Sequence, residues 1–322
     1  MDKNIFFKRK GPFLPNALFP TLKFKKKLKI FDINNLKNAK NSDLTFLDNI
    51  DYIDFAKFTK ASYCITTEKF KDYLPKNCEP ILVKNVLFEL CKVTRNFYPN
   101  ADLDIPDNSL KNPKKTSYPK VTFGKNTFVG KNSKIGKNSY IGSNTIIEQG
   151  VLIGENCTIG SQVLIRNSLI SNNVVVQDGC KIGLKGFGFI PLKEKNLRFP
   201  HIGKVIIKHN AEIGANCTID RGSINDTIIG ENTFLDNQVH VAHNVKIGRN
   251  CMIAGQVGFA GSSTIGDNVS IGGQAGISGH LKIGNNVKIG GGSGVVKNIK
   301  DGSIVMGYPA VSLKDFIRNS KK

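Results

Sequence analysis

The sequence predicts a mainly β protein in which a parallel β-solenoid follows a small α/β domain. Two observations lead to this prediction. From Phe123 onward, aliphatic or aromatic residues recur at every sixth position, usually followed by Gly or another small residue, and this period is missing before about residue 118. A short repeat of this kind is typical of solenoids, in which no single coil can bury its own inner face.

Each six-residue repeat supplies one short strand and one corner. Three repeats make a coil of about 18 residues, and each coil covers the backbone of the previous one at about 4.8 Å. The longest unbroken run of inward positions is Ile229, Leu235, Val241, Ile247, Ile253, Phe259, Ile265, Ile271, Ile277, Ile283, Ile289 and Val295.

The N-terminal domain is expected to span residues 1–118. Apolar runs at 44–47, 62–66 and 81–83 predict short strands there. Apolar residues at i, i+3 and i+4 over 86–97 predict an amphipathic helix. The combination indicates a small α/β fold.

The periodic region is expected to form a second domain, 119–306. It is interrupted at 184–201 by a stretch without the period, which predicts an insertion loop, and again by the letters RGSIND before Ile229. The last residues, 307–322, are not periodic and are expected to form a short C-terminal helical tail that caps the solenoid.

Charge alone leaves the type of partner open. The 322 residues carry 46 Lys+Arg against 25 Asp+Glu, a net charge of +21. Such a charge favours an acidic partner, but abundant Lys and Asn are also what codon bias in an AT-rich genome produces. A nucleic acid is not expected as a partner, because the chain has no zinc-finger spacing, zipper helix or aromatic–basic motif.

The cysteines and the chain start favour the cytoplasm. The seven cysteines form no CxxC pair, and four of them precede a periodic aliphatic residue by two positions, as small core residues would. The basic start lacks the apolar stretch of a secretion signal. At most a peripheral membrane contact is expected, through KFKKKLKI with Phe24 and Ile30.

Counting by coils brings candidate catalytic residues together. One coil on from His243 is Gly261, and two coils on from the adjacent Asn244 is His280. His243 and His280 should therefore share a corner of the solenoid, roughly 10 Å apart. A base beside a bare backbone N–H suits acyl transfer, because the base takes a proton while the N–H stabilises the oxyanion.

Two other residues of this stretch leave alternatives open. Asp236 either orients His243 and stabilises its imidazolium or is an ordinary aspartate of a corner. His240 either supports the site or is a structural residue of a strand.

Five motifs are specific in combination: LTFLDNIDY, GFGF, IDRGSINDTIIG, DNQVHVAHN and SGH. Together they resemble the UDP-3-O-acylglucosamine N-acyltransferase family, the hexapeptide-repeat acyltransferases of bacterial lipid A biosynthesis. The resemblance implies a left-handed parallel β-helix and a homotrimer with active sites between neighbouring prisms. It implies transfer of a 3-hydroxyacyl chain from acyl carrier protein to the 2-amino group of UDP-3-O-(3-hydroxyacyl)-glucosamine, giving UDP-2,3-diacylglucosamine.

The resemblance also assigns roles to residues. His243 matches the catalytic base, Gly261 the oxyanion-binding N–H, and His280 a second active-site histidine. No metal and no cofactor are expected, since the acyl donor is carried on the phosphopantetheine of the carrier protein.

Substrate binding is expected in both domains. Phe46, Asn49 and Tyr52 match a uridine-binding F-x-x-N-x-x-Y motif, and Asn244 and His240 are expected to contact the sugar substrate. The chain departs from the family pattern at His240, where Gln is common. Its short tail also lacks a long C-terminal helix, which leaves the basic coils around Lys282, Lys288, Lys297 and Lys300 as the candidate surface for the carrier protein.

Other functions predict other features. A UDP-N-acetylglucosamine O-acyltransferase would lack the uridine domain and would have Asp at Asn244, and another hexapeptide acetyltransferase would lack the motif combination. A zinc hydratase of the γ-carbonic-anhydrase type needs converging histidines, whereas His240 and His243 lie in different columns. A non-catalytic solenoid would tolerate loss of His243.

Overall fold

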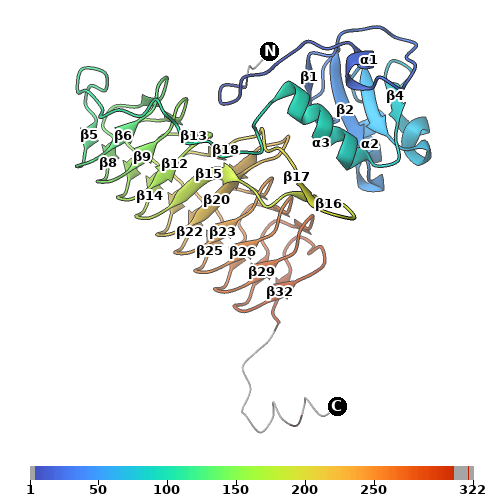
Figure 1. The fold of residues 1–322 in the computed structure, drawn as a ribbon. Helices are drawn as coiled ribbons and strands as arrows, with labels where there is room; N and C mark the ends of the chain where they lie inside the picture. The colour runs from blue at the N-terminus through green and yellow to red at the C-terminus, as the bar shows by residue number, and fades with distance from the viewer. Residues whose placement is uncertain (1–3, 308–317, 319–322) are drawn as a thin grey trace. The chain divides into compact units, whose positions relative to one another are not determined.

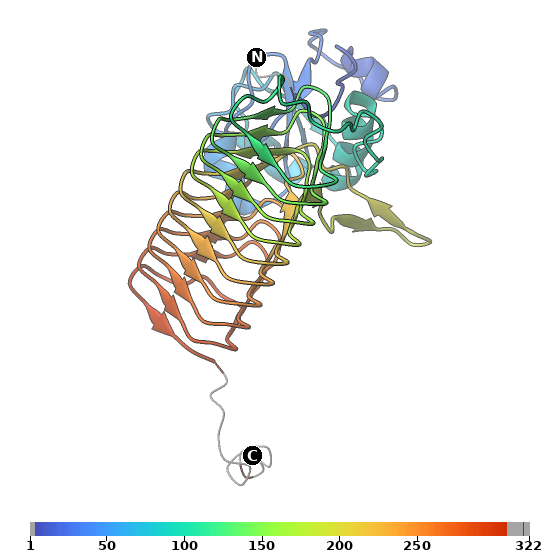
Figure 2. The same ribbon diagram turned by 90° about the vertical axis from the view of Figure 1, so that its left-hand side faces the viewer.

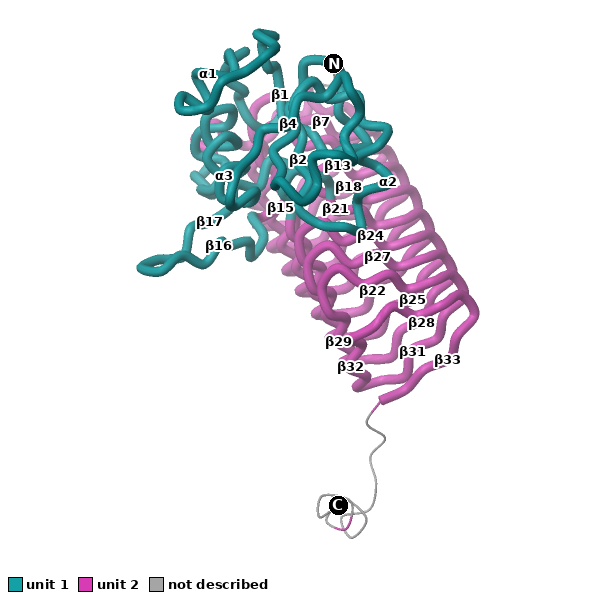
Figure 3. Tube along the Cα trace, turned by 90° about the vertical axis from the view of Figure 1, so that its right-hand side faces the viewer, with its two compact units in different colours: residues 1–106, 185–204, 221–226 teal, residues 107–184, 205–220, 227–322 magenta. Residues whose placement is uncertain are grey.

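The computed structural model describes residues 4–307 and Arg318. The expected helical tail, 307–322, lies outside the described residues apart from its first residue and Arg318. Two compact units divide the chain, and each is described by itself (Figure 3).

The larger unit is a parallel β-solenoid of three sheets, whose strands stack coil upon coil (Figures 1 and 2). The first face contains β7 (Lys134–Ile135), β10 (Leu152–Ile153), β13 (Ser168–Ile170), β18 (Val205–Ile207), β21 (Thr227–Ile229), β24 (Lys246–Ile247), β27 (Thr264–Ile265) and β30 (Lys282–Ile283). The second face contains β5 (Thr122–Phe123), β8 (Tyr140–Ile141), β11 (Thr158–Ile159), β14 (Val175–Val176), β19 (Glu212–Ile213), β22 (Phe234–Leu235), β25 (Met252–Ile253), β28 (Ser270–Ile271), β31 (Lys288–Ile289) and β33 (Ile304–Val305). The third face contains β6 (Phe128–Val129), β9 (Ile146–Ile147), β12 (Leu164–Ile165), β15 (Lys181–Lys185), β20 (Thr218–Arg221), β23 (His240–Val241), β26 (Gly258–Phe259), β29 (Gly276–Ile277) and β32 (Gly294–Val295).

In the two-residue strands of the solenoid the second residue is the buried one, except that Phe123 of β5 and Val305 of β33, at the two ends of the second face, are half-buried. Val241 pairs in parallel with Phe259, one coil further on, and both side chains are buried. The expected fold class is therefore confirmed: a mainly β chain with a parallel solenoid of six-residue repeats, in agreement with the left-handed parallel β-helix that the resemblance implies. The four solenoid cysteines are buried free thiols, as expected of core residues.

Asparagine forms many of the corners. Most non-glycine residues with positive φ are asparagines of the repeats, because the short Asn side chain tolerates the left-handed region. Their amides also bond from coil to coil, as from Asn232 to Asn250 (2.9 Å) and from Asn250 to Asn268 (3.2 Å). Codon bias is thus not the whole account of the asparagine content.

The smaller unit has a parallel four-stranded sheet in the order β1 (Asp32–Ile33), β2 (Asp43–Leu47), β3 (Tyr63–Thr66) and β4 (Glu79–Leu82). Its helices are α1 (Pro15–Leu18), α2 (Ile53–Ala56), α3 (Val86–Phe97) and the 3-10 helices η1 (Ile50–Tyr52) and η2 (Glu68–Tyr73). The Asn85 side chain caps α3 by accepting a hydrogen bond from Phe88 N (2.9 Å). The predicted strands and helix of the N-terminal domain are confirmed.

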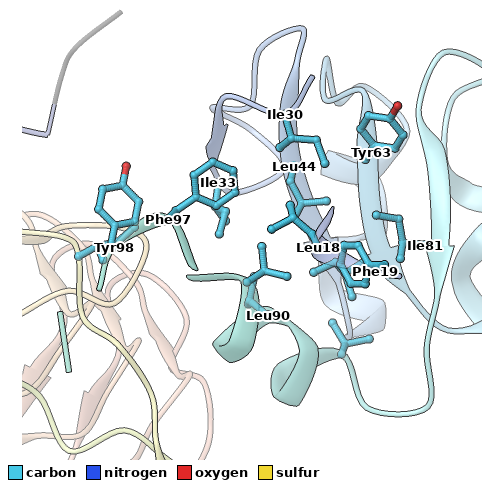
Figure 4. Packing of buried hydrophobic residues seen from close by; sticks show 14 of the residues in the cluster. Leu18, Phe19, Ile30, Ile33, Leu44, Tyr63, Ile81, Leu90, Phe97 and Tyr98 are labelled. Atoms are coloured by element: carbon cyan, nitrogen blue, oxygen red, sulfur yellow. The ribbon is translucent and has the colours of Figure 1, made fainter. Parts of the chain in front are cut away.

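This unit has two hydrophobic clusters, and the larger one contains residues of the sheet and of α3. Leu44, Tyr63 and Ile81 from three strands pack with Leu90 and Phe97 of the helix. The hydroxyl oxygens of Tyr63 and Tyr98 point out of this cluster (Figure 4). Both therefore reach polar partners, which for Tyr98 is Asp32 Oδ1 (2.6 Å).

The smaller unit is built from three chain segments: 1–106, 185–204 and 221–226. Its boundary falls at Pro106, earlier than residue 118, because Asp107 accepts a hydrogen bond from Gln149 N (2.8 Å) and so belongs to the solenoid. The expected insertion loop contains the hairpin of β16 (Phe189–Pro191) and β17 (Asn196–Arg198). Both interruptions of the period thus contribute to the smaller unit.

Arg221 ties the three segments of the smaller unit together. Its buried guanidinium donates to His201 O (2.9 Å), Ala101 O (3.2 Å) and Asp104 Oδ1 (2.8 Å). A buried cation is tolerated only when it is paired and hydrogen-bonded in this way. The letters RGSIND therefore anchor an insertion as well as interrupt the repeats.

Candidate active site

The candidate site lies at the corner that follows β23, where His243 is held in one tautomer. Its Nδ1 lies 3.0 Å from Asn244 Oδ1. An amide oxygen only accepts hydrogen bonds, so Nδ1 carries the proton and Nε2 keeps its lone pair. Asn244 in turn is held by its own backbone N–H, which donates to Thr227 Oγ1 (2.9 Å). This tautomer places the lone pair on Nε2, as a base that acts through Nε2 requires.

The imidazole of His243 lies against the bare backbone of Gly261, one coil on. A Cβ at position 261 would come within 2.7 Å of Cε1 and 2.8 Å of Nε2 of that ring, which is closer than side chains pack. Among the described residues, Gly261 N–H has no hydrogen-bond acceptor, while its carbonyl accepts from His280 N (3.0 Å). The ring and a free N–H donor are therefore neighbours, as coil counting predicted.

His280 shares this corner. Asn244, Ser262 and His280 occupy one left-handed column, with φ values of 63°, 64° and 61°. His280 thus lies two coils beyond Asn244, roughly 10 Å along the solenoid. The His280 side chain is exposed to solvent at this corner.

His240 points outward from β23 on the third face. Its Nδ1 lies 2.7 Å from the Thr218 hydroxyl of the preceding coil. Surrounding protein atoms partly desolvate the imidazole, which lowers the pKa of His240, and the nearby His243 lowers it further. Both effects favour the neutral ring.

A column of glycines follows His240 down the third face. Gly258 pairs with His240, Gly276 with Gly258, and Gly294 with Gly276. A Cβ at any of these three glycines would meet no atom within 4 Å, and none has a positive φ. Neither backbone conformation nor packing within the chain requires glycine there, and glycine in a strand often marks close approach by a ligand or another backbone.

Asp236 lies at a different corner from His243. It follows β22 on the second face, whereas His243 follows β23 on the third, and the structure does not bring the two side chains together within one chain. Asp236 Oδ1 accepts a hydrogen bond from Asn237 N (2.7 Å). The residue also lines an open groove over the second face, with Phe234, Met252 and Ile304 beside it.

The three residues of the F-x-x-N-x-x-Y motif lie in the smaller unit. Phe46 is on β2 and half-buried against the core, and Asn49 caps η1 by accepting from Asp51 N (3.0 Å). Tyr52 ends η1 and is 45% exposed. Phe46 therefore has a structural contact, while Tyr52 presents an open aromatic face.

Two features are absent from residues 4–307 and Arg318. No group of three His, Cys, Asp or Glu side chains among them is arranged to hold a metal ion. None of the helices in that part of the chain is both long and apolar enough to cross a bilayer.

Two contributions to the site went unpredicted. The Thr218 hydroxyl lies at His240 Nδ1, and the Thr227 hydroxyl accepts from Asn244 N. A threonine outside a motif gives no sign of such a contact in a single sequence. The glycine column could have been found, because residues 258, 276 and 294 follow His240 at steps of one coil.

The fold and the repeats define the class of the protein: a hexapeptide-repeat transferase fold. The family "Bacterial transferase hexapeptide (six repeats)" matches residues 120–153, 127–167, 226–261 and 262–297. Among solved structures, the UDP-N-acetylglucosamine O-acyltransferase (LpxA) of Moraxella catarrhalis is similar, with a TM-score of 0.51 and 26% identity over 63% of this chain and 77% of that one. LpxA of Acinetobacter baumannii has a TM-score of 0.51 and 24% identity over 63% and 76%.

A more specific match concerns residues 27–95, which fit the family "UDP-3-O-(3-hydroxymyristoyl) glucosamine N-acyltransferase, LpxD". The UDP-3-O-acylglucosamine N-acyltransferase of Rhizobium rhizogenes is 51% identical over 73 residues, which cover 23% of this chain and 21% of that protein. The same enzyme of Rhodopseudomonas palustris is 53% identical over 72 residues, covering 22% and 20%. The resemblance to this acyltransferase family is thus confirmed over about a fifth of the relatives' length.

Proposed function

We infer that the protein is an N-acyltransferase that moves a 3-hydroxyacyl chain from acyl carrier protein to the 2-amino group of UDP-3-O-(3-hydroxyacyl)-glucosamine. The product is UDP-2,3-diacylglucosamine, a step of lipid A biosynthesis. The observation that carries this inference is the contact between the His243 imidazole and the bare backbone of Gly261. The match of residues 27–95 supplies the choice of substrate.

In the proposed reaction the amine attacks the thioester carbonyl of the donor. His243 Nε2 takes a proton from the attacking nitrogen, and Gly261 N–H donates to the oxyanion of the tetrahedral intermediate. The C–S bond then breaks, the amide remains on the sugar, and the phosphopantetheine thiolate leaves and takes back the proton that His243 Nε2 received. Asn244 keeps His243 in the tautomer that this sequence of steps requires.

The glycine column supports a role for the third face in holding an extended substrate chain. It begins at His240 and offers three coils of backbone without side chains. An acyl chain or a phosphopantetheine arm is thin enough to lie along such a track. Phe46, Asn49 and Tyr52 are the proposed uridine contacts, with Tyr52 stacking on the base.

A homotrimer is part of the same proposal. The second face exposes Phe234, Met252 and Ile304 around an open groove, and Tyr140 several coils away on the same face. Exposed apolar patches of this kind mark interfaces. A neighbouring copy on this face would bring Asp236 to a site between subunits. The acidic carrier protein is proposed to dock on the basic coils that contain Lys282 and Lys288.

The test is a competition between two acceptors. The protein is offered UDP-3-O-(3-hydroxyacyl)-glucosamine and UDP-N-acetylglucosamine together, with a panel of 3-hydroxyacyl carrier proteins, and the products are weighed and treated with mild alkali. We expect an alkali-stable amide on the first acceptor. An alkali-labile ester on the second would instead make the protein an O-acyltransferase.

A further inference from the structure

A lysine-rich segment of the smaller unit, residues 22–30, presents exposed side chains that take no part in the candidate site. Lys23, Lys25, Lys27 and Lys29 alternate along the chain and are all exposed. The segment is not a regular strand and bends at Lys25, so what the four lysines share is their exposure to solvent. We call these four side chains, together with Leu28, the lysine ribbon.

The backbone of the ribbon is fixed to the folded unit. Both carboxylate oxygens of Glu79 accept from the backbone, at 2.7 Å from Lys25 N and 2.9 Å from Lys26 N. The Tyr63 hydroxyl donates to Lys26 O (2.9 Å) and accepts from Leu28 N (3.1 Å). The four lysines are therefore presented by an ordered segment, so that binding loses little backbone entropy.

Phe24 and Ile30 of the segment point inward and are not available to bind a partner. The rings of Phe24 and Tyr63 meet edge to face with centroids 6.0 Å apart, and Ile30 is fully buried. Phe24 and Ile30 therefore do not present the apolar surface that a membrane contact of this segment was expected to use, because both side chains face the core. Since no aromatic ring of the ribbon is presented for base stacking, the surface does not suit a single-stranded nucleic acid.

The outward residues combine charge with one apolar side chain. Within the described part of the chain, none of the four lysines forms an ion pair, and Glu79, the carboxylate at the segment, is bound to backbone amides. Leu28 is 49% exposed between Lys27 and Lys29. Cations around an exposed leucine match a surface with anionic headgroups over an apolar interior.

We propose that the lysine ribbon docks the protein on an anionic lipid bilayer. A lysine near such a surface strengthens binding by about fivefold, so four supply several hundredfold in low salt. The biological reason for docking rests on the proposed function. A product with two acyl chains partitions into a bilayer, and docking would place the enzyme beside that bilayer.

The test measures sedimentation of the full chain with vesicles in the absence of any substrate. Vesicles of phosphatidylcholine alone are compared with vesicles that contain about 30% phosphatidylglycerol, in low and in high salt. We expect binding to the anionic vesicles only, and its loss in high salt. Because no substrate is present, failure of the acyltransferase assay would not affect this result.

Two matched variants separate the ribbon from the net charge of the chain. One replaces Lys23, Lys25, Lys27 and Lys29 by Gln, and the control replaces the exposed solenoid lysines Lys114, Lys115, Lys125 and Lys134 by Gln. We expect the ribbon variant to lose at least about tenfold in vesicle affinity and the control to keep most of it. Unfolding curves verify that both variants fold.

Three results would overturn the proposal. The ribbon variant could bind vesicles as the unchanged protein does, or the control could lose as much affinity, which would reduce the effect to net charge. The third is a ribbon variant that keeps its vesicle binding and loses affinity for an acidic carrier protein, because the partner would then be a protein. Leu28→Ser adds a further readout: its residual binding in high salt should fall below that of the unchanged chain.

Discussion

At the residue scale, one amide oxygen determines what His243 can do. Asn244 Oδ1 accepts from Nδ1, and the lone pair on Nε2 then faces the glycine backbone of the next coil. In other acid–base pairs a carboxylate has this orienting role. A neutral amide orients the ring in the same way but brings no negative charge to it.

His240 predicts a pH effect of definite sign. Its pKa is lowered in the folded protein, so the unfolded chain binds more protons between the folded and unfolded pKa values. The contribution of His240 to stability is therefore present above its ordinary pKa of about 6.5 and is lost as the pH falls through the lowered value.

The measurement is a series of thermal unfolding curves for the unchanged chain and for His240→Gln. The other histidines are common to both proteins, so the difference isolates His240. As the pH falls from neutral to mildly acidic, the unchanged chain should lose more stability than the variant. Parallel curves over this range would contradict the lowered pKa.

The sequence could predict the pairing of His243 with Gly261, because a constant coil length converts spacing into contact. It could not predict that Asn244 rather than Asp236 would contact His243 within the chain. That contact depends on the side-chain direction at a left-handed corner, which a single sequence does not specify. The spacing of the asparagines could have predicted where the left-handed corners of the repeats fall, because most of these corners carry Asn.

At the element scale, the glycine column makes the third face unlike the other two. Gly276→Leu should leave the melting temperature nearly unchanged, because a side chain there meets no atom of the chain. With a long acyl donor the turnover should fall by about 10–100-fold, since the added side chain displaces the chain from its track. The control is Thr264→Leu, an exposed residue of the first face.

Turnover with donors of several chain lengths distinguishes a blocked track, which affects long donors most, from a defect in assembly, which affects all donors. A Gly276→Leu protein that keeps full activity with every donor would show that no substrate lies along the column. The molecular mass in solution is recorded for both variants, so that an effect on assembly is recognised.

The second element-scale prediction concerns the insertion at residues 221–226. Replacing Arg221 by Met removes the cation that binds three oxygens of the smaller unit. Breaking a buried pair in this way costs about 3–5 kcal/mol. Urea unfolding of the smaller unit, followed by tyrosine fluorescence, measures the loss.

Arg249→Met is the matched control. Arg249 pairs with Asp267 at 3.0 Å on an exposed surface, where such pairs contribute about 0–1 kcal/mol. Equal effects of the two substitutions would contradict the anchoring role of Arg221.

Most elements were predictable because their signals are local. A period of six residues specifies strand, corner and inward face at once, and the apolar spacing of 86–97 specified α3. The assignment of 185–204 and 221–226 to the smaller unit was not predictable, because it depends on contacts with residues far away in the sequence. Arg221 gave no sign of its burial in the sequence.

At the scale of the whole molecule, the proposed trimer explains why Asp236 and His243 lie at different corners of one chain. If the site is shared, Asp236→Asn and His243→Ala chains should complement each other when they are mixed and reassembled. Each mixed trimer would have one intact site among its three interfaces. Activity of the mixture is compared with that of each variant reassembled alone.

Mixtures without activity, despite verified mixed trimers, would contradict a site that Asp236 of one chain shares with His243 of the next. Full activity of Asp236→Asn reassembled alone would remove Asp236 from the reaction. Each chain carries a different tag, so that mixed trimers are purified before the assay. Mixed trimers of the unchanged protein and His243→Ala give the upper limit of the activity that complementation can restore.

The central claim is that His243 acts as the base of an acyl transfer beside Gly261. It is tested most directly by the turnover of UDP-3-O-(3-hydroxyacyl)-glucosamine and 3-hydroxyacyl carrier protein by the unchanged chain and by His243→Ala, with unfolding curves for both. We predict that kcat falls by about 10²–10⁴-fold while stability is nearly unchanged, because the side chain lies at an outer corner. A His243→Ala protein with full activity and unaltered stability would contradict the account.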